Sequence, residues 1–189
     1  MPQPRSGTDE AQICLAELSS AGADFSALPD IAPQEGCFAR NSVQVARVGG
    51  DMGSRLQVSG LSRVSCPTAR SFAAWVRYGV DRAARQYLGS PVVRIETFGS
   101  YSCRNVAGSS RRSAHSRAEA VDVSGFVLAD GRRITLVQDW NGGTASERQF
   151  LRVVQESACK RFGTVLGPEY NAAHADHFHL ESGRGSFCR

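Results

Sequence analysis

The sequence predicts an α+β fold in which an antiparallel sheet packs against two long helices. Residues 67–89 and 144–163 carry apolar side chains at three- and four-residue steps, which is the periodicity of an amphipathic helix. Residues 91–101 and 119–138 alternate β-branched or apolar residues with polar ones, which is the periodicity of a half-buried strand. Each helix needs a partner for its apolar stripe, and the sheet is the partner we expect.

The length of the chain favours a single domain. Its 189 residues, of which 41% are hydrophobic, suffice for one substantial core and are fewer than two full domains usually need. We expect this domain to span residues 12–189, after a disordered or weakly ordered tail over residues 1–11. No apolar run reaches the roughly 18 residues of a membrane-spanning helix, so we expect no membrane insertion, and we expect a monomer.

The first expected elements are a short helix and a hairpin. Thr8 and Asp9 favour the start of a helix over residues 8–21, and a loop rich in Pro, Ala and Asp follows it. Residues 41–48 alternate and are β-branched, which predicts a strand. Residues 54–60 can pair with this strand across the turn Gly-Gly-Asp-Met-Gly.

The two long helices have recognisable ends. The first follows Cys66-Pro67 and stops at Gly89, a residue that readily ends a helix. The second opens with a capping-box pattern, in which Thr144 and Glu147 can satisfy each other's backbone N–H groups.

The remaining strands supply the sheet. It begins with residues 91–101 and continues in residues 119–138, where two alternating runs meet at Asp130-Gly131. That dipeptide favours a tight hairpin turn because both residues accept positive φ. Asp122 is therefore expected on a strand, and the chain should close with a strand at TVL, a Gly-Pro loop and a short last strand at HFHL.

Six cysteines, at positions 14, 37, 66, 103, 159 and 188, are spread over the whole chain. Their even number and the absence of a CxxC spacing favour disulfides in an oxidising compartment. The alternative is a cytosolic protein with reduced, buried cysteines. The sequence does not choose among the pairings that six cysteines allow. In an exported protein, Met1 would replace a removed leader.

The charge of the chain is mildly basic, at +4 with a sequence pI near 8.9. Arginines and lysines are scattered singly and lack interleaved aromatic residues, so we expect no nucleic-acid partner. The same excess would suit a polyanionic envelope polymer rich in carboxylates, although solubility alone could explain it.

All four histidines fall in two places, His115 in SAHSRAEAVD and the other three in HADHFH. Histidine and carboxylate are ligands that Zn²⁺ accepts, and a catalytic zinc site needs three protein ligands and one position left for water. His115, Asp122 and one histidine of the second motif would supply them. Such a site would lie on a face of the sheet.

The second motif places two histidines on one side of an extended segment. Residues two apart share a face of a strand, so His177 and His179 can point at one ligand while Phe178 turns into the core. Asp176 comes one residue earlier, and its carboxylate would need a bend of the chain to reach the same side.

Other interpretations of these residues are weaker. Three histidines in six residues can be an incidental cation-binding tract, and a lone aspartate is usually a turn or salt-bridge residue. Ser113, His115 and Asp122 lie too close in sequence for an ordinary serine-hydrolase triad, and the chain lacks a GxSxG elbow. It also lacks an HExxH helix. The two motifs together favour a metal site.

These motifs carry a family resemblance. SAHSRAEAVD resembles the SxHxxGxAxD motif of the lysostaphin, D-alanyl-D-alanine carboxypeptidase and hedgehog group of metallopeptidases, and DHFH resembles their second motif. Together with GSYSCR, FLRVVQESACKRFGTVLGPEYN and HADHFHLE, they resemble the bacterial extensin-like C-terminal domain family over roughly residues 12–188. That family is similar to peptidoglycan peptidases.

The resemblance implies a zinc peptidase of the periplasm or another exported part of the cell envelope. It implies that His115, Asp122 and His179 hold Zn²⁺, which activates a water against a peptide bond in a peptidoglycan stem. It leaves open whether the enzyme is an endopeptidase or a D,D-carboxypeptidase.

Five further residues receive roles from the same resemblance. Asp176 or His177 would face the activated water and take its proton. Arg104 would bind the substrate carbonyl and stabilise the oxyanion. Ser113 and His174 would contact the substrate.

One position departs from the motif. Ala118 stands where the family has glycine, and Glu119 follows where a small or amide residue is usual. If this position needs positive φ, alanine would strain the loop by about 1 kcal/mol or more.

Two non-catalytic alternatives remain at this point. The domain could be a zinc-stabilised cell-wall binding or scaffold module, as in the hedgehog branch, or a structural domain whose histidines capture metal incidentally. The presence of Asp176, Arg104 and Ser113 beside the ligands favours catalysis.

Overall fold

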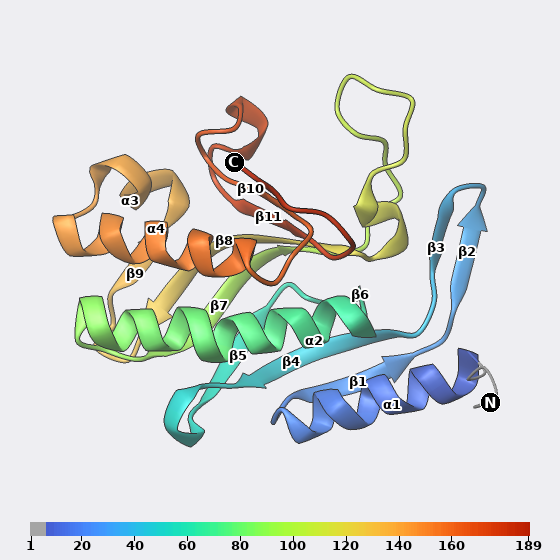
Figure 1. Cartoon of the computed structure of the whole chain (residues 1–189), viewed down its shortest axis with the longest axis horizontal. Coiled ribbons are helices and arrows are strands. Elements are labelled where there is room, and N and C mark those ends of the chain that lie inside the picture. Colours follow the sequence, from blue (N-terminus) through green and yellow to red (C-terminus); the bar gives the residue numbers. More distant parts are fainter. Residues whose placement is uncertain (1–6) are drawn as a thin grey trace.

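The structure is a computed structural model that describes residues 7–189, in which helices pack on one large sheet (Figure 1). The α-helices of the described residues are α1 (Gly7–Ser20), α2 (Cys66–Trp75), α3 (Leu136–Gly142) and α4 (Ala145–Cys159). Two π-helical segments follow α2, namely η2 (Val76–Asp81) and η3 (Ala84–Leu88). The 3-10 helices are η1 (Asp51–Gly53), η4 (Ala114–Arg117) and η5 (Ala172–His174). Of the tail expected over residues 1–11, residues 1–6 lie outside the described part and the rest belongs to α1.

The strands of residues 7–189 form one ten-stranded sheet and a separate two-stranded ribbon. They are β1 (Asp24–Leu28), β2 (Ile31–Gln34), β3 (Cys37–Ala39), β4 (Ser42–Gly49), β5 (Arg55–Ser59), β6 (Val64–Ser65), β7 (Val92–Gly99), β8 (Ala120–Leu128), β9 (Arg133–Thr135), β10 (Thr164–Leu166), β11 (Phe178–Glu181) and β12 (Phe187–Cys188). The order in the large sheet is β1-β4-β5-β7-β8-β11-β10-β12, with β6 paired to β4 and β9 to β8. The ribbon consists of β2 and β3.

The large sheet is mixed, which corrects the expectation of an antiparallel sheet. Most neighbours are antiparallel, including β4–β5, β7–β8 and β8–β11. The pairs β5–β7 and β10–β12 are parallel. The chain returns from β5 to β7 through α2 and the helical segments after it, and such a crossover lets two neighbouring strands run in the same direction. Side-chain alternation reveals a strand but not the direction of its neighbour.

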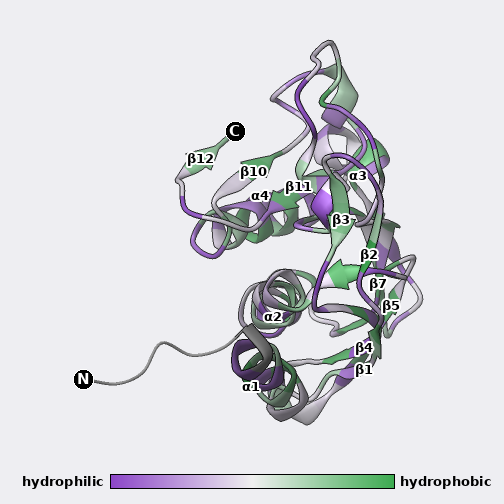
Figure 2. Cartoon of the chain, turned by 90° about the vertical axis from the view of Figure 1, so that its right-hand side faces the viewer, coloured by the Kyte–Doolittle hydropathy of each residue, from purple (hydrophilic) through white to green (hydrophobic). Residues whose placement is uncertain are grey.

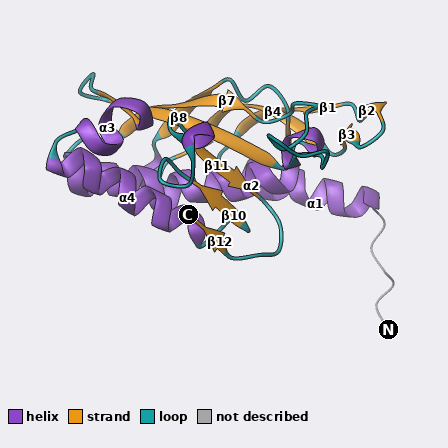
Figure 3. Cartoon of the chain, turned by 90° about the horizontal axis from the view of Figure 1, so that it is seen from above, coloured by secondary structure: helices purple, strands orange, loops and turns teal. Residues whose placement is uncertain are grey.

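The helices α1, α2 and α4 lie on one side of the sheet (Figures 2 and 3). Trp75 of α2 meets Phe126 of β8 edge to face, with ring centroids 6.3 Å apart. Its indole N–H donates a hydrogen bond to the carbonyl of Val154 in α4 at 3.0 Å, so one side chain joins both helices to the sheet. Because Trp75 is completely buried, its replacement by alanine would cost about 3–5 kcal/mol.

The expectation of two long helices is correct only in part. The segment predicted over residues 67–89 is helical, but it is α-helical in α2 and largely π-helical after Trp75. Gly89 ends it in the left-handed region with φ of 67°, as expected of a helix-terminating glycine. In α4 the predicted capping box is present, with reciprocal bonds between Thr144 and Glu147.

Several elements were not predicted. The segment expected as a loop after α1 contains β1, β2 and β3, and the predicted strand over residues 119–138 ends early because residues 136–138 begin α3. Thr135 caps that helix by accepting a hydrogen bond from the Gln138 N–H at 3.3 Å. Strand β12 is exposed and has two residues, too few for a visible alternation. The predicted hairpin of β4 and β5 and the turn at Asp130-Gly131 between β8 and β9 are confirmed.

All six cysteines form disulfides, which pair Cys14 with Cys66, Cys37 with Cys103, and Cys159 with Cys188. These bonds indicate an oxidising, exported environment, as the cysteine count predicted. Each bond joins segments between 29 and 66 residues apart, so the pairing follows from the fold and not from local spacing. Within residues 7–189, none of the helices has the length and hydrophobicity of a membrane-spanning segment.

Candidate metal centre

Three elements bring His115, Asp122 and His179 together. Asp122 lies on β8 and His179 on β11, and the two residues are directly opposite each other in the antiparallel pairing of these strands. Their neighbours Val123 and Phe178 belong to the core, so alternation directs Asp122 and His179 to the other sheet face. His115 reaches them from η4, the short helix that precedes β8. All three side chains are buried.

The three side chains turn donor atoms toward a common centre, where Asp122 faces His115 with Oδ2 and His179 with Oδ1. Nε2 of His115 lies 3.1 Å from Oδ2 of Asp122 and 3.2 Å from Nδ1 of His179. Nδ1 of His179 lies 3.0 Å from Oδ1 of Asp122. In a tetrahedral zinc site with bonds of about 2.0–2.1 Å, ligand atoms are separated by roughly 3.3 Å. The spacing of these donors therefore fits Zn²⁺.

The outer nitrogen of each imidazole is already occupied. Nδ1 of His115 donates to the backbone carbonyl of Ser100 at 2.5 Å, and Nε2 of His179 donates to the Glu181 carboxylate at 3.4 Å. In the neutral rings, the nitrogens that face each other therefore carry lone pairs and no hydrogen. Two lone pairs at 3.2 Å beside a carboxylate repel one another unless a proton or a cation lies between them. The donor set thus suits a cation.

The electrostatics of the cluster agree with this picture. Burial by itself would lower the pKa of His179, but hydrogen bonds to Asp122 and Glu181 outweigh burial and raise it to about 9. Burial by itself would raise the pKa of Asp122, but its polar contacts with His115 and His179 hold it well below its usual range. Without metal, a proton on His179 fills the centre at neutral pH, and a metal ion would have to displace it.

His177 and Asp176 form a pair beside the three central residues. Nδ1 of His177 lies 2.8 Å from a carboxylate oxygen of Asp176, and its Nε2 lies 3.6 Å from Oδ1 of Asp122. The ring of Phe98 meets the His177 ring edge to face at 5.8 Å. The Asp176 side chain is half exposed, so its carboxylate reaches the centre through His177 and does not face it directly.

A cleft of about 660 Å³ adjoins the centre. Arg104, Ser113 and His174 all line it, as do His177 and His179. Arg104 forms an ion pair with Asp122 at 3.7 Å, and Ser113 accepts a hydrogen bond from the His115 N–H at 3.4 Å. The structure therefore brings all eight residues singled out in the sequence to one region, with Asp176 at its edge.

His174 lines the same cleft as Arg104. Its Nδ1 lies 2.7 Å from the side-chain oxygen of Asn171, and its ring is 5.1 Å from that of His177. Burial, followed by the charges of His177 and His179, lowers the pKa of His174 to about 4. His174 is therefore neutral at pH 7.

Two partners of His115 and His179 were not predicted from the sequence. Glu181 lies two residues after His179 on β11, and alternation on a strand could have placed it on the same face. The Ser100 carbonyl carries no sequence signal, because every residue has one. Gly99 precedes it with φ of 104°, a conformation that favours glycine and turns the chain out of β7 toward His115.

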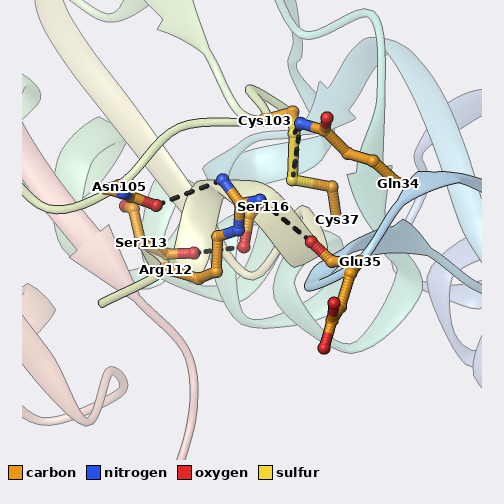
Figure 4. Close-up of a disulfide and its surroundings, with 8 residues drawn as sticks. All are labelled: Gln34, Glu35, Cys37, Cys103, Asn105, Arg112, Ser113 and Ser116. Atoms are coloured by element: carbon orange, nitrogen blue, oxygen red, sulfur yellow. Dashed lines mark hydrogen bonds between the residues drawn. A yellow bond between two sulfur atoms is a disulfide. The ribbon is translucent and has the colours of Figure 1, made fainter. Parts of the chain in front are cut away.

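The loop that carries Arg104 and Ser113 is anchored to the β2–β3 ribbon. Figure 4 shows the disulfide between Cys37 of the ribbon and Cys103 of the loop. Cys103 directly precedes Arg104 in the chain. Arg112 adds a second link, since its guanidinium donates to the Glu35 carbonyl at 2.9 Å and to the Asn105 side chain at 3.1 Å. The ribbon, expected as plain loop, thus supports one wall of the cleft.

Ala118 adopts the conformation that the motif's glycine would favour. Its φ is 56° and its ψ is 29°, in the left-handed region. The residue is buried, its N–H bonds to the His115 carbonyl at 3.1 Å, and its carbonyl accepts from the Ser65 N–H at 2.8 Å. The expected strain is therefore present between two of the central residues, and the surrounding bonds hold it in place.

Comparison with known proteins gives a single result. Searches of curated proteins and of solved structures find no significant match. A family model described as extensin-like protein C-terminus matches residues 12–189, which is nearly the whole chain. The chain therefore belongs to the extensin-like protein C-terminus family.

Proposed function

We propose that this chain is a zinc-dependent peptidase that hydrolyses peptide bonds in the stem peptides of peptidoglycan. The observation that carries the proposal is the meeting of His115, Asp122 and His179 beside a cleft, where ligand atoms from any two of the three side chains approach to 3.0–3.2 Å. Zinc bound there would polarise the substrate carbonyl and acidify a water molecule. The motif resemblance noted above supplies the substrate class.

His177 is the best candidate for the general base. Its Nδ1 donates to Asp176, which leaves a lone pair on Nε2 at the edge of the centre. This nitrogen can accept a proton from a nucleophilic water and deliver it to the leaving amine. Asp176 would orient the ring and stabilise the imidazolium, as a carboxylate does for a catalytic histidine in other hydrolases.

Arg104 and Ser113 supply hydrogen-bond donors to the substrate. The Arg104 guanidinium is half exposed in the cleft and lies beside Asp122, where it could stabilise a developing oxyanion by about 3 kcal/mol. The Ser113 oxygen accepts from the His115 N–H, so its own proton remains free for the substrate. His174, neutral at pH 7, would contact the substrate without adding charge.

The location that fits this function is the periplasm. Three disulfides require an oxidising compartment, and peptidoglycan lies outside the cytoplasmic membrane.

The decisive experiment measures metal and hydrolysis in the same preparation. The protein is purified without chelator, bound metal is measured by elemental analysis, and cross-linked peptidoglycan and isolated muropeptides are digested and analysed by mass spectrometry. We expect stoichiometric zinc and a hydrolysed D-amino-acid bond in the original protein. Hydrolysis should be lost in His177→Ala and in Asp176→Ala. Stoichiometric zinc without product would favour a zinc-stabilised cell-wall binding module, and the absence of tight metal would overturn the proposal.

A further inference from the structure

The cleft beside the centre has two chemically different walls. The first is formed by the loop between β7 and β8 and carries four arginines: Arg104, Arg111, Arg112 and Arg117. The second comes from residues 164–187 and includes Tyr170 and Phe187, whose rings meet edge to face at 5.9 Å. Glu181 is the one acidic residue among the described residues that line the cleft. Such an excess of positive charge favours a negatively charged ligand.

The arginines of this wall differ in what they already bind. Arg117 pairs with Glu119 at 2.7 Å, and Arg104 pairs with Asp122 at 3.7 Å. The Arg112 guanidinium is held by Asn105 and by the Glu35 carbonyl. Arg111 is exposed, and its guanidinium makes no hydrogen bond or ion pair with any described residue.

Local bonds place Arg111 at the cleft. Its carbonyl accepts from the Val106 N–H at 2.9 Å, and its own N–H bonds to the Ser109 hydroxyl at 3.1 Å, so the loop tip turns back tightly. Arg111 lines the same cleft as Arg117 and Glu181. Arg111 thus offers an uncommitted guanidinium that faces the same space as the metal centre.

We propose that Arg111 forms a carboxylate-binding subsite, which holds an acidic group of a peptide laid along the cleft. The guanidinium would bind the carboxylate through paired N–H donors, while Tyr170 and Phe187 in the same cleft would pack against apolar parts of the peptide. The inference rests on the proposed function in taking the ligand to be a peptide. A side chain or the C-terminus of the peptide can supply the carboxylate, since both offer the same chemistry.

Calorimetry with three synthetic pentapeptides tests the subsite. All three end in D-alanyl-D-alanine. The first has a glutamate side-chain carboxylate and an amidated C-terminus, and the second has an amidated glutamate side chain and a free C-terminal carboxylate. The third, neutral peptide has neither carboxylate. We expect one of the two peptides with a carboxylate to bind zinc-loaded protein about five- to tenfold more tightly than the neutral peptide. The peptide that binds more tightly shows whether the side chain or the C-terminus supplies the carboxylate. Arg111→Gln should remove this preference.

Arg82→Gln is the matched control, because it removes the same charge from the helical layer, where Arg82 is half exposed and pairs with Asp51. It should retain the preference for the carboxylate peptide. Equal binding of all three peptides, undetectable binding of all three, or an unchanged preference in Arg111→Gln would overturn the subsite. Mass spectrometry of the same samples separates this inference from the proposed function. Carboxylate-dependent binding without a hydrolysed product would support the subsite and contradict the proposed peptidase activity. Hydrolysis without a preference for the carboxylate peptides would support the peptidase activity and contradict the subsite.

Discussion

Glu181 accepts a hydrogen bond from Nε2 of His179 at 3.4 Å, two residues along the same strand. This bond leaves the lone pair on Nδ1 facing Asp122 and His115. We predict that Glu181→Gln weakens zinc binding about 10- to 100-fold, as is typical when the partner of a metal-binding histidine is changed. Competition with a chromophoric chelator measures the affinity. Glu17→Gln removes the same charge on α1, where Glu17 is half exposed, and should change nothing. Equal affinities of the two variants would remove Glu181 from the centre.

Variants of the proposed zinc ligands should differ in metal content from variants of neighbouring residues. We predict that His115→Ala and His179→Ala lose stoichiometric zinc, because two remaining donors hold zinc poorly. Asp176→Ala should keep the metal and lose turnover, because its carboxylate contacts His177 and not the three central donors. Elemental analysis of the purified variants gives the answer. Stoichiometric zinc in either histidine variant would contradict the assignment of that histidine as a ligand.

Zinc binding should depend on pH through His179. Its pKa is raised to about 9 in the metal-free protein from the ordinary histidine value of about 6.5, and zinc must displace the proton. We predict that zinc affinity rises about tenfold per pH unit until about pH 9 and then levels off. Titrations between pH 6.5 and 9.5 would check this, and a flat profile would contradict the role given to His179.

The same group predicts the opposite slope for the stability of the metal-free protein. Because the folded pKa lies above the unfolded one, the stabilisation from protonated His179 is complete below about pH 6.5 and is lost as the pH rises toward 9. Thermal unfolding of chelator-treated protein should show this decline. In His179→Gln the decline over this window should be absent.

The Cys37–Cys103 disulfide should matter for the site as well as for stability. It closes 66 residues and the Cys14–Cys66 disulfide closes 52, so removal of either should cost a similar free energy of unfolding, about 4 kcal/mol in the chain-entropy model. Only Cys37→Ala/Cys103→Ala frees the loop that carries Arg104 and Ser113. We predict weaker zinc binding and slower hydrolysis for this variant at a temperature where both variants are folded. Equal function of the two variants would show that the ribbon does not position the site.

Ala118 allows a test of backbone strain. Ala118→Gly relieves the strain of an alanine in the left-handed region, which is about 1–2 kcal/mol. The same change removes a buried methyl group and makes the unfolded chain more flexible, and both effects lower the stability. We predict a stability within about 1 kcal/mol of the original, because these effects nearly cancel. Ala118→Val should lose about 2 kcal/mol or more, since a β-branched residue fits this conformation poorly. Denaturant unfolding provides the values, with exposed Ala46→Val on β4 as control. A harmless Ala118→Val would refute the strain.

Local sequence determined much of the fold and named the residues of the site. The helix ends at Gly89 and at the Thr144–Glu147 capping box depend on contacts within a few residues, so the sequence predicts them directly. The same holds for the face shared by His177 and His179. The histidines were recognisable because all four lie in two short motifs.

Only the tertiary structure decided how distant segments meet. The parallel pairing of β5 with β7, the three disulfides and the ribbon of β2 and β3 depend on contacts between segments far apart in the chain. The Ser100 carbonyl could hold His115 only after Gly99 turned the chain toward it, and a backbone carbonyl leaves no trace in residue type. Alternation places Asp122 and His179 each on a face of its strand, but their direct opposition requires the register between β8 and β11, which is set by packing of the whole sheet.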